Sequence, residues 1–346
     1  MSITIVIEQM LELFAMMLTG YLFWKKEWMD ESGYQKLSAI VVNLLNPLLM
    51  LSGILGQSVE GESEFLKINL ILTLLYYAIL ICLGVLIVWI LRPEKSQRKI
   101  YQLMSIFPNV GFMGIPVITG IYGKNSMICI IFYMLGYNLL LYTFGIYLAK
   151  KAGMEAETAG AVETIAGTGT KKEVPTDRID KTKREQNGQK EKNTGEQATW
   201  KRMLNPGVIT SVLAIILFIF QISVPTVVEG FCDYMGNATI PLSMMLIGMS
   251  IAKADLKKIF SNGRIYLFVL IKMVILPVSA AFLLRRLPLN SMVAGVFVLQ
   301  LAMPVGSIVT LIAEENGADE TCCTNGIVLS TLASIVTIPL VGLFLR

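Results

Sequence analysis

Histidine is absent from the 346-residue sequence, and only 16% of its residues are charged. Without histidine there is no His-based acid–base catalysis, no His-ligated metal site and no HExxH protease. The five cysteines are odd in number and contain no CxxC pair, so we expect small buried side chains rather than a disulfide framework. No nucleophile–base set stands out. We therefore expect no enzyme, no cofactor and no metal.

Apolar residues make up 54% of the chain, the mean hydropathy is +0.64, and the runs are longer than a soluble core needs. A bilayer-spanning helix takes roughly 20 apolar residues. The first run, from Ile3 to about Trp24, lacks the basic start of a signal peptide and is predicted to be a retained span. We predict an all-α multi-pass protein with ten spans, near residues 3–24, 36–55, 66–91, 99–121, 126–150, 206–222, 236–253, 264–285, 291–313 and 322–345. None of these ranges contains an aspartate, which excludes an intramembrane protease with paired aspartates.

Residues 151–202 differ from the apolar spans because they are polar and charged, and they include the run KKEVPTDRIDKTKREQNGQKEKNTGEQ. Such a segment cannot bury enough apolar surface to fold alone, so we expect a flexible cytoplasmic linker. With the N-terminus outside, the cytoplasmic connections hold 23 of the 29 Lys and Arg residues and the outer ones hold five. Without the linker's twelve the count is 11 against five. The distribution predicts a cell-membrane protein with both termini outside.

The two halves of the chain share a pattern. Span two reads NLLNPLLMLSGI and span seven NATIPLSMMLIGM, each with an Asn four residues before Pro47 or Pro241. Span four contains FPNVGFMGIP and span nine AMPVGS; Pro108 follows Pro47 by 61 residues, and Pro304 follows Pro241 by 63. Five spans in each half reverse the orientation of the second half. We therefore predict two inverted five-helix repeats, residues 1–150 and 203–346.

Spans four and nine are predicted to be broken near mid-depth. Proline removes a helical hydrogen bond, and non-helical backbone in the membrane is tolerated only in protein or beside a cavity. Two breaks at matching places in two halves predict a midplane binding site, where half-helix N-termini favour an anion. The candidate binding residues at the breaks are Pro108, Asn109, Gly111, Gly114, Pro116, Gln300, Pro304, Gly306 and Ser307. For each single Pro or Gly, a packing kink is the simpler explanation.

Further candidates lie in other spans. Asn43, Asn46 and Asn237 flank the repeated Pro-Leu pairs and are added to the binding set. Lys272 falls inside span eight, where it either snorkels to the interface or acts in charge coupling, by balancing a substrate carboxylate or replacing a coupling cation. Glu8 and Glu12, one turn apart in span one, fit a solvated mouth better than a proton relay.

FPNVGFMGIPVITGIYG and NATIPLSMMLIGMSIA resemble the auxin efflux carrier family, in its short bacterial branch, and the resemblance covers residues 1–150 and 203–346. It implies two inverted five-helix repeats, a scaffold and a transport domain, and broken helices that cross. It also implies transport of a small organic anion, such as an auxin-like acid or malate. By position, Pro108 and Asn109 match the family's first crossover and Pro304 its second. AMPVGS matches only partly, and span three lacks the carboxylate of plant members.

The sequence thus predicts a secondary carrier that exports a small organic anion by alternating access. A channel or uniporter of the same fold, and a non-transporting membrane sensor with the linker as its signalling part, are the alternatives. The expected partners are the anion and the lipid bilayer, with a coupling proton or sodium ion and a homodimer left open, and no nucleic acid.

Overall fold

The computed structural model describes residues 3–55, 62–167, 206–254, 259 and 263–345. The described residues are helical, joined by short loops, and their one β-type contact is an isolated bridge between Pro108 and Val305. Within the described part of the chain, seven helices are long and apolar enough to cross a membrane: Thr4–Lys25, Glu31–Ser52, Glu64–Leu91, Lys124–Ala156, Thr226–Lys253, Gly263–Leu284 and Thr321–Leu343. Shorter apolar helices cover Val110–Tyr122, Pro206–Ile219 and Ser291–Ala302. The prediction of an all-α membrane protein is confirmed, whereas ten spans and an inverted repeat remain predictions.

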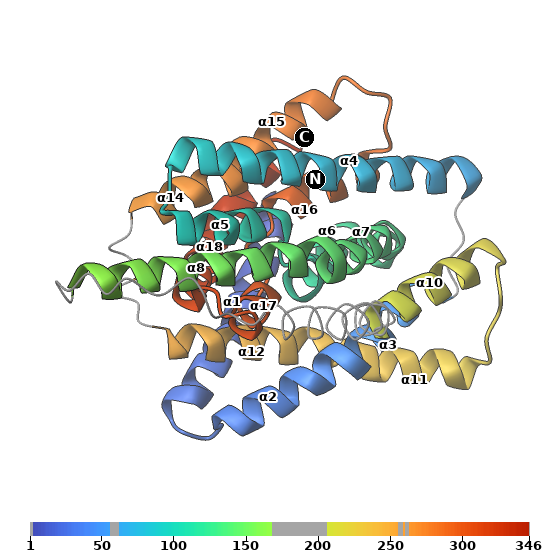
Figure 1. Cartoon of the computed structure of the whole chain (residues 1–346). Coiled ribbons are helices and arrows are strands. Elements are labelled where there is room, and N and C mark those ends of the chain that lie inside the picture. Colours follow the sequence, from blue (N-terminus) through green and yellow to red (C-terminus); the bar gives the residue numbers. More distant parts are fainter. Residues whose placement is uncertain (1–2, 56–61, 168–205, 255–258, 260–262, 346) are drawn as a thin grey trace, which may run out of the picture.

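One group of helices includes α2, α3, α11 and α12 along the lower edge of Figure 1, and α1, which descends from the upper centre to join α2. In it α1 packs along α12, α11 packs on α3, and α10 also contacts α3. The elements of this group, here named the lower group, are α1 (Ile3–Lys25), α2 (Glu31–Ile40), η1 (Val41–Leu45), α3 (Asn46–Ser52), α10 (Pro206–Ile219), α11 (Thr226–Asn237) and α12 (Thr239–Lys253).

The second group, here named the core group, fills the rest of the molecule. Helix α5 packs between α4 and α8, and α18 contacts α14, α16 and α17. Its elements are α4 (Glu62–Leu91), α5 (Lys95–Ile106), η2 (Val110–Gly114), α6 (Ile115–Tyr122), η3 (Lys124–Ser126), α7 (Met127–Leu140), η4 (Leu141–Gly145), α8 (Ile146–Gly167), α14 (Gly263–Leu270), η5 (Ile271–Ile275), α15 (Leu276–Leu284), α16 (Ser291–Ala302), α17 (Ile308–Glu315) and α18 (Glu320–Leu343). The two groups meet where α1 contacts α6 and α18, and where α10 contacts α7.

The exposed face of α4 is apolar. Leu70, Ile71, Leu74, Val85 and Trp89 are all more than 45% exposed on this 30-residue helix. A contiguous apolar surface of this kind is costly in water and is what a lipid-facing helix presents.

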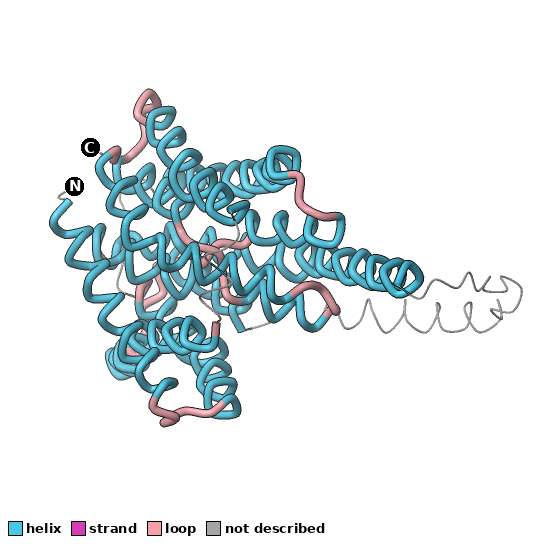
Figure 2. Tube along the Cα trace, turned by 90° about the vertical axis from the view of Figure 1, so that its left-hand side faces the viewer, coloured by secondary structure: helices cyan, strands magenta, loops and turns pink. Residues whose placement is uncertain are grey.

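The connections gather at two ends of the molecule. In Figure 1 the α1–α2 and α4–α5 connections and the C-terminal end of α8 lie on the left, and the α10–α11 connection lies on the right. Figures 1 and 2 place the start of α1 close to the end of α18. Of the Lys- and Arg-rich connections of the sequence, the two that the structure describes in full, α1–α2 and α4–α5, lie at this left-hand end.

Prolines explain most of the π-helical turns. The described segments η1, η2 and η5 each end two residues before a proline, namely Pro47, Pro116 and Pro277. Proline has no N–H to donate and its ring displaces the carbonyl four residues before it, so the preceding turn widens by one residue. The positions of these prolines in the sequence therefore determine where three helices are locally distorted.

Two boundaries differ from the sequence analysis. Helix α8 continues to Gly167, through the Ala- and Glu-rich beginning of the segment expected to be a linker, because these residues favour helix; residues 168–202 of that segment lie outside the described residues. The apolar segment Thr226–Lys253 starts ten residues before the predicted span seven and includes Asp233. This candidate span thus contains an aspartate, whereas none of the ten predicted spans does, because amphipathic α11 has no long apolar run.

The lower group depends on close packing of α1 against α12. A Cβ added at Gly248 would lie 1.9 Å from the carbonyl oxygen of Met17, and one at Gly20 would lie 2.1 Å from that of Met245. Small residues at such crossings let helix backbones approach in a membrane, where packing drives association.

We predict that Gly248→Ala lowers the thermal unfolding midpoint of the detergent-purified protein by several degrees, because overpacking a tight contact costs about 1–3 kcal/mol. Gly230→Ala is the matched control, since nothing lies within 4 Å of a Cβ at that position. Equal midpoints for the two variants would contradict the packing described here.

Candidate functional site

Two interrupted helices meet at one crossing in the core group. Helix α5 ends at Ile106 and the chain resumes as η2–α6 at Val110; helix α16 ends at Ala302 and resumes as α17 at Ile308. Pro108 and Val305 form an antiparallel bridge. Asn109 N–H donates to Pro304 O at 2.7 Å, and Gly306 N–H donates to Phe107 O at 2.9 Å. Segments almost 200 residues apart are thus joined by backbone hydrogen bonds.

Neighbouring side chains satisfy other backbone groups of the crossing. Ser330 Oγ of α18 accepts from Val305 N–H at 3.0 Å, and Tyr76 Oη of α4 donates to Gln300 O at 3.1 Å. Lys272 Nζ donates to Met303 O at 2.6 Å. Since buried backbone groups need partners, Ser330 and Lys272 help to stabilise the extended segment 303–306, and Tyr76 helps to stabilise the end of α16.

Gly306 allows the two chains to approach. A Cβ there would lie 2.9 Å from Tyr137 Oη and 3.1 Å from the carbonyl oxygens of Phe107 and Pro108. The Tyr137 side chain and the backbone of Phe107 and Pro108 would have to shift to admit any other residue. The crossing in this form therefore requires a glycine at position 306.

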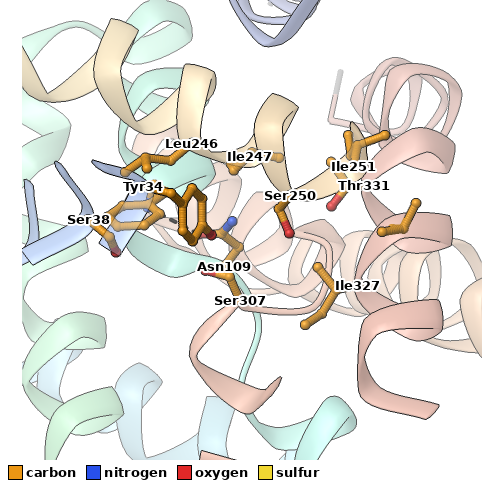
Figure 3. Close-up of a pocket in the computed structure, with 12 residues that line it drawn as sticks. Tyr34, Ser38, Asn109, Leu246, Ile247, Ser250, Ile251, Ser307, Ile327 and Thr331 are labelled. Carbon is orange, nitrogen blue, oxygen red and sulfur yellow. Dashed lines mark hydrogen bonds between the residues drawn. The ribbon is translucent and has the colours of Figure 1, made fainter. Parts of the chain in front are cut away.

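A small cavity lies between the crossing and the lower group. It is lined by the crossing residues Asn109, Phe112 and Ser307, together with Tyr34 and Ser38 of α2, Leu246, Ile247, Ser250 and Ile251 of α12, and Ile327, Val328 and Thr331 of α18. Figure 3 shows Tyr34 next to Asn109 and Ser307. Ser250 of α12 lies nearby, one helical turn after Leu246. The cavity volume is about 20 Å³, room for a water molecule and too little for an organic acid.

Helix N-termini give this cavity its polarity. Asn109 precedes η2–α6, and its Oδ1 accepts from Phe112 N–H at 3.1 Å; Ser307 precedes α17. Among the described residues, no charged side chain lines the cavity. Two helix N-termini, each with a partial positive charge, therefore adjoin a space lined by hydroxyl, amide and apolar groups, and their charge favours an anion.

Tyr34 is held in place by a cluster at the end of the lower group. Lys253 Nζ lies 3.5 Å from the centroid of the Tyr34 ring, 4.5 Å from that of Trp24, and 2.6 Å from Glu31 Oε2. Cation–π and ion-pair contacts thus fix the aromatic wall of the small cavity.

A larger cavity of about 350 Å³ lies between the two groups, on the other side of η2. Its walls are Gln9, Glu12, Leu13 and Met16 of α1, Leu49, Ser52 and Gly53 at the end of α3, Pro116, Thr119 and Gly120 of α6, and Lys124, Met127, Asn237 and Ile240. This volume is within the range of small-molecule sites. Glu12 lies at this cavity, in keeping with a solvated mouth, whereas Glu8 is simply exposed.

An ion pair links the two groups beside the larger cavity. Lys124 Nζ of η3 lies 3.2 Å from Asp233 Oδ1 of α11, and the same oxygen accepts a short hydrogen bond from Ser52 Oγ of α3. The Lys124 side chain is 56% exposed, so the pair contributes little to stability and can separate at low cost.

The predicted binding residues fall into distinct places. Asn109 and Ser307 line the small cavity, while Pro116 and Asn237 line the larger one. Pro108, Pro304 and Gly306 form the crossing, the buried amide of Gln300 lies against Gly114, and Asn46 lies next to Gly111. Asn43 is not part of either cavity and donates to Ala39 O of its own helix. Lys272 is fully buried, so it does not snorkel.

Sequence reasoning missed the partners from distant helices. Tyr34, Ser38, Ser250 and Thr331 complete the small cavity, and Tyr76 and Ser330 bond the crossing. Isolated Ser, Thr and Tyr residues in apolar helices carry no distinctive spacing. The one indication in the sequence was that these residues are polar, which is unusual within an apolar run.

A multi-pass arrangement of apolar helices with a crossing of two broken helices is typical of membrane transport proteins. Residues 5–341 match the family described as "Membrane transport protein". The chain belongs to this family, which is the auxin efflux carrier family named by resemblance above. It is 22% identical over 336 residues to an uncharacterized transporter of Methanothermobacter thermautotrophicus, covering 96% of each chain. It is 23% identical to an uncharacterized transporter of Methanocaldococcus jannaschii, covering 81% of this chain and 79% of that one.

We predict that Ser330→Ala lowers the thermal unfolding midpoint, because Val305 N–H then loses its buried acceptor, which costs about 1–3 kcal/mol. Ser211→Ala is the matched control: Ser211 is equally buried but its hydroxyl bonds only Gly207 O of its own helix. A midpoint for Ser330→Ala no lower than that of Ser211→Ala would show that the crossing does not depend on this bond.

Proposed function

We propose that this membrane transporter is a secondary carrier for a small organic anion and that the small cavity beside the crossing is its binding site. The observation that carries the proposal is that Asn109 and Ser307, each preceding a helix N-terminus of a different half of the chain, line one cavity. Donors and helix dipoles are gathered there without a competing carboxylate.

Alternating access is supported by the position of the two cavities. The small cavity and the larger one both lie between the lower group and the core group, and η2–α6 contributes to each. A movement of the core group relative to the lower group would enlarge one space while closing the other. The exposed Lys124–Asp233 pair joins the two groups and would have to break in that movement.

The proposed orientation follows the positive residues. The described connections rich in Lys and Arg, α1–α2 and α4–α5, lie at the left-hand end of Figure 1, and we assign this end to the cytoplasm, with both termini outside. In this orientation the small cavity lies on the cytoplasmic side and is closed, and the larger one lies on the outer side. This assignment suits export, since an anion from the cytoplasm would reach Asn109 first, and the inverted five-helix repeat accounts for the crossing of two like breaks.

We predict that Asn109→Asp reduces anion affinity at least tenfold while leaving the fold intact, because the carboxylate keeps the bond from Phe112 N–H but repels an anion. Thermal-shift titrations of purified protein with mono- and dicarboxylates, malate among them, measure the affinity. Asn138→Asp is the matched control, since Asn138 lies in α7 and donates only to Met134 O of its own helix. Unchanged affinity in Asn109→Asp would remove this residue from the site.

A carrier and a channel give different results in proteoliposomes. We predict that uptake of the labelled acid identified by thermal shift saturates, and that preloading with the unlabelled acid drives transient accumulation of label above equilibrium. Counterflow requires a site exposed alternately to each side. Non-saturating flux without counterflow would instead show a channel, and Asn109→Asp liposomes provide the background rate.

A further inference from the structure

Lys272 is a fully buried lysine whose described surroundings include no carboxylate partner. Its side chain has no exposed surface, although Lys in a membrane helix usually reaches the interface. The ion pairs among the described residues are Lys124–Asp233 and Lys253–Glu31, and neither includes it. A fully buried ammonium without an anionic partner is costly, so its surroundings must supply negative potential in another form.

The C-terminal end of α16 supplies that potential. Lys272 Nζ donates to the carbonyl of Met303, the first residue after this half-helix, at 2.6 Å. The Gln300 carbonyl, one turn earlier, accepts from Tyr76 Oη. The end of a helix carries a partial negative charge on its free carbonyls, and here that end is buried at the crossing.

The place of the ammonium is one that other carriers use for ions. In carriers with discontinuous helices, unwound carbonyls and half-helix C-termini coordinate the coupling Na⁺. Met303 O belongs to such a helix end and precedes Pro304, whose carbonyl accepts from Asn109 N–H. A cation bound to Met303 therefore acts on the crossing through two consecutive residues.

Lys272 lies on a part of the core group that can hold it rigidly. It is in η5, the π-helical turn before Pro277, between α14 and α15. This turn contacts both α16 and α18. The charge is thus carried on the same group of helices as the carbonyl that it binds, and would move with it.

We propose that the Lys272 ammonium is a tethered cation that occupies the helix-end position where ion-coupled carriers bind Na⁺, and that it makes this protein independent of sodium. Lys272 is a positioning residue: it holds the end of α16, and through it the crossing, rather than contacting the substrate. The consequence for flux rests on the proposed function, but the binding of a cation at Met303 does not.

The first test removes the tether and supplies a free cation. Lys272→Ala, purified in detergent, is expected to unfold several degrees below the parent in choline chloride. Propylammonium, which replaces the missing methylenes and ammonium, is expected to restore at least half of that loss with saturation, and Na⁺ is expected to restore part of it. Lys124→Ala is the control, because Lys124 is exposed and should show no saturable response. Failure of both cations to restore Lys272→Ala would overturn the proposal.

Two more variants keep the test decisive if Lys272→Ala does not fold. Lys272→Arg retains a cation, and Lys272→Met retains the length of the side chain without charge. The Arg variant is expected to yield more monodisperse protein than the Met variant on size-exclusion chromatography. Equal or better yield and stability for Lys272→Met would show that the charge is dispensable.

The parent protein tests sodium independence directly. Its unfolding midpoint, and its anion flux where flux is found, are expected to be the same in sodium and choline salts. A midpoint or a flux that requires Na⁺ would contradict the proposal. Since the stability measurements use no organic anion, their result stands even if the protein carries a different substrate.

Discussion

Backbone polar groups at membrane depth must find partners inside the protein, and the crossing of the two broken helices depends on this constraint. Lipid offers no hydrogen bonds, so a helix interrupted by Pro108 or Pro304 would leave donors and acceptors unpaired. The structure pairs the two breaks with each other, through Asn109 N–H to Pro304 O and Gly306 N–H to Phe107 O. Each break is therefore stable only because the other is present. This mutual dependence fixes where the two N-termini point, and hence where an anion would be attracted.

The same constraint explains why these apolar helices contain buried polar residues, which would destabilise the protein if they had no hydrogen-bond partner. Ser330 accepts from Val305, and Lys272 donates to Met303. Both belong to the core group, as does the crossing. The small cavity, in contrast, takes Tyr34 from the lower group, where Lys253 holds the ring. The site thus has a wall fixed to each group, and relative motion of the groups would change the site without breaking the crossing.

Local signals in the sequence predicted the breaks, since Pro108, Pro304 and their glycines disrupt helices regardless of the rest of the fold. The depth of Lys272 was also evident, because an apolar run surrounds it. Its partner was not, since a backbone carbonyl has no sequence signature. Tyr34 and Ser250 come from α2 and α12, which reach the crossing because α12 packs against η2 and α2 packs against α12. Asn43, chosen from the repeated pattern, bonds its own helix instead. Patterns in sequence locate backbone distortions well, but they do not reveal which distant helix faces them.

The sizes of the two cavities bear on the conformation of the molecule. About 20 Å³ beside Asn109 excludes a carboxylic acid, while about 350 Å³ is open beside Glu12 and Asn237. In the proposed mechanism this is a state closed on the side of Tyr34, and access to the proposed site would require the lower group and the core group to separate there. On the opposite side the groups are held by Lys124 and Asp233, an exposed pair that is weak in water. A weak contact is what a transporter needs at such a place, because a strong one would trap a single state. The strong interactions, the buried hydrogen bonds of the crossing, lie instead within the group that would move as a unit.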